Sequence, residues 1–195
     1  MRVRRLTAAV GAMMAILACS QRTEPGSVEL PEYFPAPSFQ GVTAEGELFR
    51  SESLQGKVVV VSFFFTSCTG PCPILNSRLS VLQSIFSDEP DVRFVSITVD
   101  PERDTPPVLK SYAERYGAKP GRWYFVRMSP DSVEWLAVKG FRVPGSSSQP
   151  ELHTTRCVLI DRRGIVRGFF SGTEEGQVKQ LEQAIRRLLR TQVGA

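Results

Sequence analysis

The sequence has few of the side chains from which metal and redox sites are usually built, with one histidine and four cysteines among 195 residues. It also lacks a strong charge imbalance, since 24 Lys and Arg stand against 20 Asp and Glu. Arg2, Arg4 and Arg5 fall in residues 1–18, which hold no acid, so residues 19–195 carry 24 − 3 = 21 basic against 20 acidic residues. A net charge of +1 gives no case for nucleic-acid binding.

The apolar run near the start of the chain is too short for a permanent membrane-spanning helix. Leu6–Ala18 has 13 residues, follows a positively charged segment and is followed directly by Cys19. This pattern resembles a bacterial lipoprotein signal. We therefore predict a signal peptide over residues 1–18 and a lipid on Cys19, with a plain secretory signal and a stray thiol as the alternative. The predicted location is the cell envelope, anchored by lipid to a membrane, with the domain facing the periplasm or the exterior.

Subtracting Cys19 leaves three cysteines, Cys68, Cys72 and Cys157. An odd number of thiols in an exported domain argues against a disulfide scaffold and favours a reactive or metal-binding pair. We interpret Cys157 as core packing rather than as a third sulfur ligand or a resolving thiol. Strand alternation places it on the face of His153, but about 13 Å away in an extended chain.

The chain is expected to form one domain behind a tether. Residues 19–37 are polar and rich in proline and read as the tether, and residues 38–192 as the domain. Apolar patterns predict strands over 39–42, 47–49, 58–65, 92–99, 123–127, 156–161 and 165–170, and helices over 73–87, 105–117, 129–139 and 173–190. Residues 140–152 read as a flexible loop. The fold class is α/β, with an N-terminal β-hairpin and a mixed central sheet covered by helices on both faces.

Cys68 and Cys72 lie in a loop between a buried strand and a helix. With Pro73 at the first helical position, Cys72 is expected at the helix N-cap, where the helix dipole favours thiolate and lowers the thiol pKa. Loops at the carboxyl ends of strands converge, so the loop before His153 could bring its imidazole to the two sulfurs. Two thiolates and one imidazole suit Cu(I) or zinc. Three ligands are few for structural zinc and enough for Cu(I).

Two acids follow the strand over 92–99. Asp100 and Asp104 lie in Val99-Asp100-Pro101-Glu102-Arg103-Asp104-Thr105-Pro106. One interpretation makes Asp100 a turn former and Asp104 a support for the helix start. A functional role is the alternative.

Together these residues resemble the Sco/SenC family of thioredoxin-like copper proteins over nearly all of 36–190. The resemblance rests on Phe64-Phe65-Thr66-Ser67-Cys68 through Cys72-Pro73, on the Asp-Pro-x-x-Asp-x-Pro segment, and on the distant His153-Thr154. It implies a thioredoxin-like fold, copper ligation by Cys68, Cys72 and His153, and a place for Asp100 near the metal. The sequence departs from the family at Cys157, where the family usually has an aromatic or aliphatic residue, and in the unusual loop filling Thr69-Gly70-Pro71.

The resemblance further implies a copper chaperone for cytochrome c oxidase assembly that uses Cu(I), or also Cu(II). Its partners would be the copper-binding subunit of the oxidase, with other copper chaperones or thiol reductants, and the membrane through the lipid. The alternative function is enzymatic, a thiol-disulfide oxidoreductase in which Cys68 and Cys72 are the catalytic pair. Thioredoxin-type reductants carry a proline facing their cysteines. Here that stretch reads Leu152-His153-Thr154, which favours metal binding.

Overall fold

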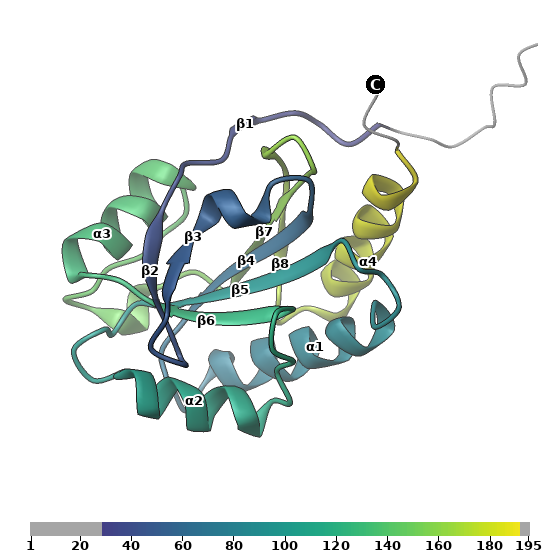
Figure 1. The fold of residues 1–195 in the computed structure, drawn as a ribbon. Coiled ribbons are helices and arrows are strands. Elements are labelled where there is room, and N and C mark those ends of the chain that lie inside the picture. The colour runs from purple at the N-terminus through teal and green to yellow at the C-terminus, as the bar shows by residue number, and fades with distance from the viewer. Residues whose placement is uncertain (1–28, 192–195) are drawn as a thin grey trace, which may run out of the picture.

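The computed structural model describes residues 29–191, which form one eight-stranded mixed sheet with helices on both faces (Figure 1). Among these residues, no helix has the length and apolar character needed to cross a membrane. The strand order across the sheet is β1 (Phe34–Pro35), β8 (Ile165–Ser171), β7 (Arg156–Ile160), β4 (Val58–Phe64), β5 (Val92–Thr98), β6 (Trp123–Arg127), β2 (Gln40–Thr43) and β3 (Leu48–Arg50).

The central strand β4 is buried along its whole length, as its continuous apolar sequence predicts. It pairs in parallel with β5 and antiparallel with β7. Its alternating side chains contribute to two cores. Val58, Val60 and Phe64 belong to one, and Val59, Val61 and Phe63 to the other.

The helices divide between these two cores. The apolar sides of α1 (Pro71–Ile85), α2 (Pro106–Arg115) and α4 (Glu175–Arg190) belong to the first core and lie on one side of the sheet (Figure 1). The opposite core contains residues of α3 (Pro130–Trp135), which continues directly as the π-helical turn η2 (Leu136–Gly140). It also contains Leu54, the last residue of the short 3₁₀ helix η1 (Ser51–Leu54). The α/β fold class, the mixed sheet and the N-terminal hairpin β2–β3 are therefore confirmed.

A short strand lies within the segment predicted as a tether. The backbone amides of Tyr33 and Ala36 donate to carbonyls of Val166 and Gly164, which adds β1 to the edge of the sheet. Contacts with the sheet therefore begin before residue 38. The sequence does not predict this strand, because two residues are too few to show an alternating pattern. The predicted signal peptide, Cys19 and the tether up to residue 28 lie outside the described residues.

The topology brings several segments together at the edge of the sheet that is formed by the carboxyl ends of β4 and β5, which is not the edge occupied by strand β1. Since β4 and β5 are parallel, the loops that follow them leave at the same edge. Since β7 is antiparallel to β4, with Val61 opposite Val158, the segment that leads into β7 arrives at this edge as well. The loop carrying both cysteines and the segment carrying the histidine are thereby brought together.

Candidate metal centre

Cys68, Cys72 and His153 converge at this edge. One potential ligand atom from each lies within 4.8 Å of the other two. Two sulfurs on one metal ion lie at most about 4.6 Å apart, twice a metal–thiolate bond of about 2.3 Å. A single ion could therefore engage all three ligand atoms after small side-chain adjustments. Among the residues from 29 to 191, this is the only group of three or more histidine, cysteine or acidic side chains close enough to hold an ion.

The histidine is held in one tautomer. Its Nδ1 lies 2.7 Å from the carbonyl oxygen of Thr154, an atom that only accepts hydrogen bonds, so Nδ1 carries a proton. In the neutral ring, Nε2 then has the free lone pair, and it lies 3.1 Å from Sγ of Cys72. Burial lowers the pKa of His153, although the bond to Thr154 opposes this effect. The imidazole is therefore neutral at pH 7 and oriented so that Nε2 could serve as a ligand atom.

Cys72 lies inside helix α1 rather than at its N-cap. The helix begins at Pro71 and its N-cap is Gly70, because the fixed φ of Pro71 suits the first helical position. The expectation that the helix start lowers the thiol pKa is also wrong. Burial raises the pKa of Cys72 to about 12, against a hydrogen bond from the backbone of Phe65 that lowers it. Desolvation of the thiolate thus outweighs the hydrogen bond that stabilises it.

Cys68 is the more accessible thiol. Its side chain is partly buried, whereas Cys72 is fully buried, and both are free cysteines. The amide of Cys68 donates to the carbonyl of Phe65, which closes a turn between the end of β4 and the start of α1.

Phe65 contacts all three candidate ligands and was not singled out from the sequence. Its backbone lies near enough to the Cys72 thiol to lower the pKa of that thiol, and its carbonyl accepts a hydrogen bond from the Cys68 amide. Its ring meets the His153 ring edge-to-face, with 5.4 Å between centroids. Its position at the end of an apolar strand made it look like ordinary core, because the pattern of apolar residues does not say which of them border a site.

The two acids of the Asp-Pro-x-x-Asp-x-Pro segment have different roles. The carbonyl of Asp100 accepts from the amides of Arg103 and Asp104, which makes it a turn former. Its buried Oδ2 has no hydrogen-bond partner among the described residues, and an exposed Arg103 guanidinium lies 3.7 Å away. Asp100 is outside the three-ligand group. Its predicted place near the metal stays a prediction.

Asp104 does not support the start of α2 as expected. That helix begins after Thr105 with no side-chain cap. The Asp104 carboxylate instead accepts hydrogen bonds from Thr66 and Thr98. Burial raises its pKa, while the bonds from the two threonines lower it in part.

Cys157 packs in the core. It is fully buried on β7 beside Gly172, where a Cβ atom would come within 3.2 Å of its sulfur. Burial raises its pKa to about 12. It is not part of the ligand group.

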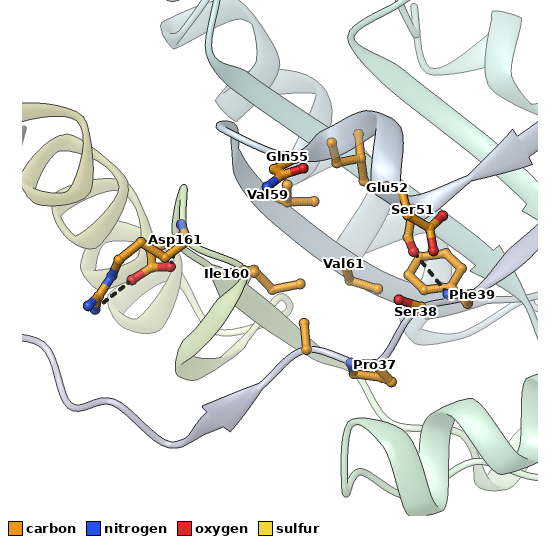
Figure 2. A pocket seen from close by; sticks show the side chains of 14 residues that line it. Pro37, Ser38, Phe39, Ser51, Glu52, Gln55, Val59, Val61, Ile160 and Asp161 are labelled. Atoms are coloured by element: carbon orange, nitrogen blue, oxygen red, sulfur yellow. Dashed lines mark hydrogen bonds and ion pairs between the residues drawn. The ribbon is translucent and has the colours of Figure 1, made fainter. Parts of the chain in front are cut away.

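A pocket of about 210 Å³ lies elsewhere on the molecule (Figure 2). It is lined by Phe39, Val59, Val61 and Ile160 together with polar residues of η1. Val59 and Ile160 are paired near the start of β4, whereas the ligands follow its far end. The pocket therefore does not belong to the metal centre.

The chain is similar to proteins of one known family. The sequence model of the SCO1/SenC family matches residues 31–190. The "SCO1 protein homolog" of Bacillus subtilis is 30% identical over 149 residues, covering 74% of this chain and 77% of that protein. A SCO1/SenC family lipoprotein from Bacillus anthracis superposes with a TM-score of 0.73 at 28% identity, covering 80% of this chain and 95% of that chain.

Two further solved structures share the fold. BsSco, described as a member of the Sco family of cytochrome c oxidase assembly proteins with a disulfide switch, has a TM-score of 0.74 at 26% identity and covers 84% of this chain and 98% of its own. Yeast Sco1, solved with copper bound, has a TM-score of 0.68 at 24% identity and covers 84% of this chain and 92% of its own. The likeness to the yeast protein concerns the fold, which is the thioredoxin-like Sco fold.

Proposed function

We propose, starting from the fact that this chain belongs to the SCO1/SenC family, that it is a membrane-tethered copper chaperone. Cys68, Cys72 and His153 bind copper, and the chain delivers it to the binuclear copper site of cytochrome c oxidase. The observation that carries the proposal is the convergence of these three side chains, with ligand atoms within 4.8 Å of one another. Its relatives support the rest, since one is a lipoprotein and another belongs to a family of oxidase assembly proteins.

The donor set suits Cu(I). Two thiolate sulfurs are soft ligands, and an imidazole completes a three-coordinate site that leaves room for an incoming ligand. Loading releases the Cys72 proton, because the metal binds the thiolate and the free thiol is protonated at neutral pH. Cys68 is the accessible end of the site, so a partner's ligand can exchange there while Cys72 and His153 still hold the ion.

A Cu(I) titration of the reduced full chain in detergent tests ligation. The wild type should bind one ion per chain, and His153→Ala, Cys68→Ser and Cys72→Ser should each weaken binding strongly. Unchanged affinity and stoichiometry in His153→Ala would show that the ligand set is wrong. Mixing the copper-loaded chain with an apo binuclear copper domain of an oxidase subunit tests delivery, and copper that stays on this chain would contradict that part.

A second candidate is thiol-disulfide exchange by Cys68 and Cys72. The observation in its favour is that both thiols are free and close together, so a small movement could join them. The raised pKa of Cys72 disfavours it as the attacking group, which leaves Cys68 to attack and Cys72 to resolve the mixed disulfide. Rapid catalytic turnover of a disulfide substrate without copper would favour this enzyme over the chaperone.

A further inference from the structure

We infer that Asp104 is the positioning residue of this metal centre, because its carboxylate clamps Thr66 and thereby fixes Phe65, the residue that contacts all three ligands. The inference rests on the proposed function. It concerns a side chain that does not itself reach the ligands.

The clamp is a buried carboxylate that accepts hydrogen bonds from the loop after β4 and from the end of β5. Asp104 has no exposed surface. Its Oδ2 accepts from the backbone amide of Thr66 at 3.1 Å and from the hydroxyl of Thr98, and its Oδ1 accepts from the hydroxyl of Thr66. Thr98 is the last residue of β5, and Thr66 lies in the loop after β4. The carboxylate therefore ties the cysteine loop to the neighbouring strand end.

Thr66 transmits this constraint to the ligands through its neighbours. The turn from Phe65 to Cys68 contains Thr66 and is closed by the bond from the Cys68 amide to the Phe65 carbonyl. The Phe65 backbone also lies near enough to the Cys72 thiol to lower its pKa, and the Phe65 ring packs edge-to-face on the His153 ring with 5.4 Å between centroids. Asp104 holds both the amide and the hydroxyl of Thr66. The adjacent Phe65 therefore has little freedom to shift relative to the three ligand atoms.

The position of Asp104 is not explained by local helix structure. Asp104 directly precedes Thr105, the N-cap of α2. From this position its carboxylate could have accepted hydrogen bonds from the free amides of the first helical turn. Its oxygens instead turn to Thr66, 38 residues earlier in the chain. Supporting contacts of this kind behind metal ligands typically change metal affinity by about 10- to 100-fold when removed.

Two variants remove the clamp in different ways. In Asp104→Asn the amide nitrogen cannot accept a hydrogen bond, so at least one of the three donors loses its acceptor. Thr66→Val removes one hydroxyl donor and keeps the backbone amide. Ser62→Ala is the matched control. Ser62 on β4 forms a buried hydrogen bond of 2.9 Å with Ser96 on β5, so it also links these two strands, but away from the ligands.

The readouts are Cu(I) affinity by chelator competition, the sulfur-to-copper charge-transfer band of the Cu(II)-loaded full chain, and amide hydrogen exchange over residues 65–68. Asp104→Asn should bind Cu(I) about 10- to 100-fold more weakly, and its band should shift. Thr66→Val should change the Cu(I) affinity and the band in the same direction but by a smaller amount. The amides of residues 65–68 should exchange faster in both variants. Thr66→Ser, which keeps both donors, should restore wild-type values, and Ser62→Ala should match wild type in all three readouts.

Copper affinity and exchange in Asp104→Asn and Thr66→Val that equal those of Ser62→Ala would overturn the role of Asp104. If Asp104→Asn does not fold, Thr66→Val against Thr66→Ser decides the question. A wild-type chain that binds no copper would overturn the proposed function instead. The exchange rates over residues 65–68 would then still decide whether Asp104 holds the loop.

Discussion

The Nε2 atom of His153 lies 3.1 Å from the sulfur of Cys72, although 81 positions separate the two residues in the chain. The contact exists because β7 runs antiparallel to β4, so the residues before β7 return to the edge where β4 ends. An imidazole lone pair faces a buried thiol there. Metal binding is thereby linked to proton release and to the integrity of the sheet.

Copper binding should strengthen as pH rises. Burial raises the pKa of Cys72 to about 12, so its thiol stays protonated between pH 6 and 8 and must lose a proton to bind copper. Apparent Cu(I) affinity should therefore rise about tenfold per pH unit for this proton. Competition titrations at several pH values measure the slope. A pH-independent affinity would mean that Cys72 binds without deprotonation or is not a ligand.

The buried thiol of Cys157 should be dispensable for copper. It packs beside Gly172 and outside the ligand group, so Cys157→Ala should keep one copper per chain with unchanged affinity. Its free energy of unfolding should fall by about 1 kcal/mol, because a fully buried sulfur is lost. Metal analysis and denaturant unfolding measure the two effects. Reduced copper stoichiometry in this variant would make Cys157 a third sulfur ligand.

The buried ion pair of Asp161 and Arg167 should stabilise the fold in a pH-dependent way. The two side chains are 2.8 Å apart, and each is only 7% exposed. Burial raises the pKa of Asp161, but hydrogen bonds from the Ile165 amide and from Arg167 outweigh it and leave the pKa lowered. Arg167→Met should reduce the free energy of unfolding by about 3 kcal/mol at pH 7, since it leaves the carboxylate without this partner.

The sign of the pH effect follows from the lowered pKa of Asp161. The carboxylate contributes stability above its unfolded-state pKa of about 3.9, and this contribution disappears as pH falls through the lower folded-state value. The difference between wild type and Arg167→Met should therefore shrink below about pH 4. Lys179→Met, which breaks the exposed pair with Glu175, is the control and should hardly change the unfolding midpoint. A pH-independent difference would assign the loss to the Arg167 bonds with the Leu30 and Pro31 carbonyls.

Local patterns were sufficient to predict most of the fold. The apolar run that forms β4, the helix that ends at Arg190 and the strand Trp123–Arg127 all follow from residue spacing within a few positions. The short β1 strand was missed, because it is held only by pairing with a distant β-strand. The start of α1 was placed two residues late, because both Pro71 and Pro73 suit the first turn of a helix.

The sequence by itself determined the chemistry of the centre: two thiols four residues apart and a single imidazole, on elements of an α/β fold. Only the tertiary structure decided how these groups behave. Burial, which depends on the core that the central strands form with three helices, raises the thiol pKa of Cys72 against the hydrogen bond from the Phe65 backbone. Contacts between strand ends made Phe65 and Asp104 part of the site, and no local pattern encodes which residues meet across the edge of a sheet.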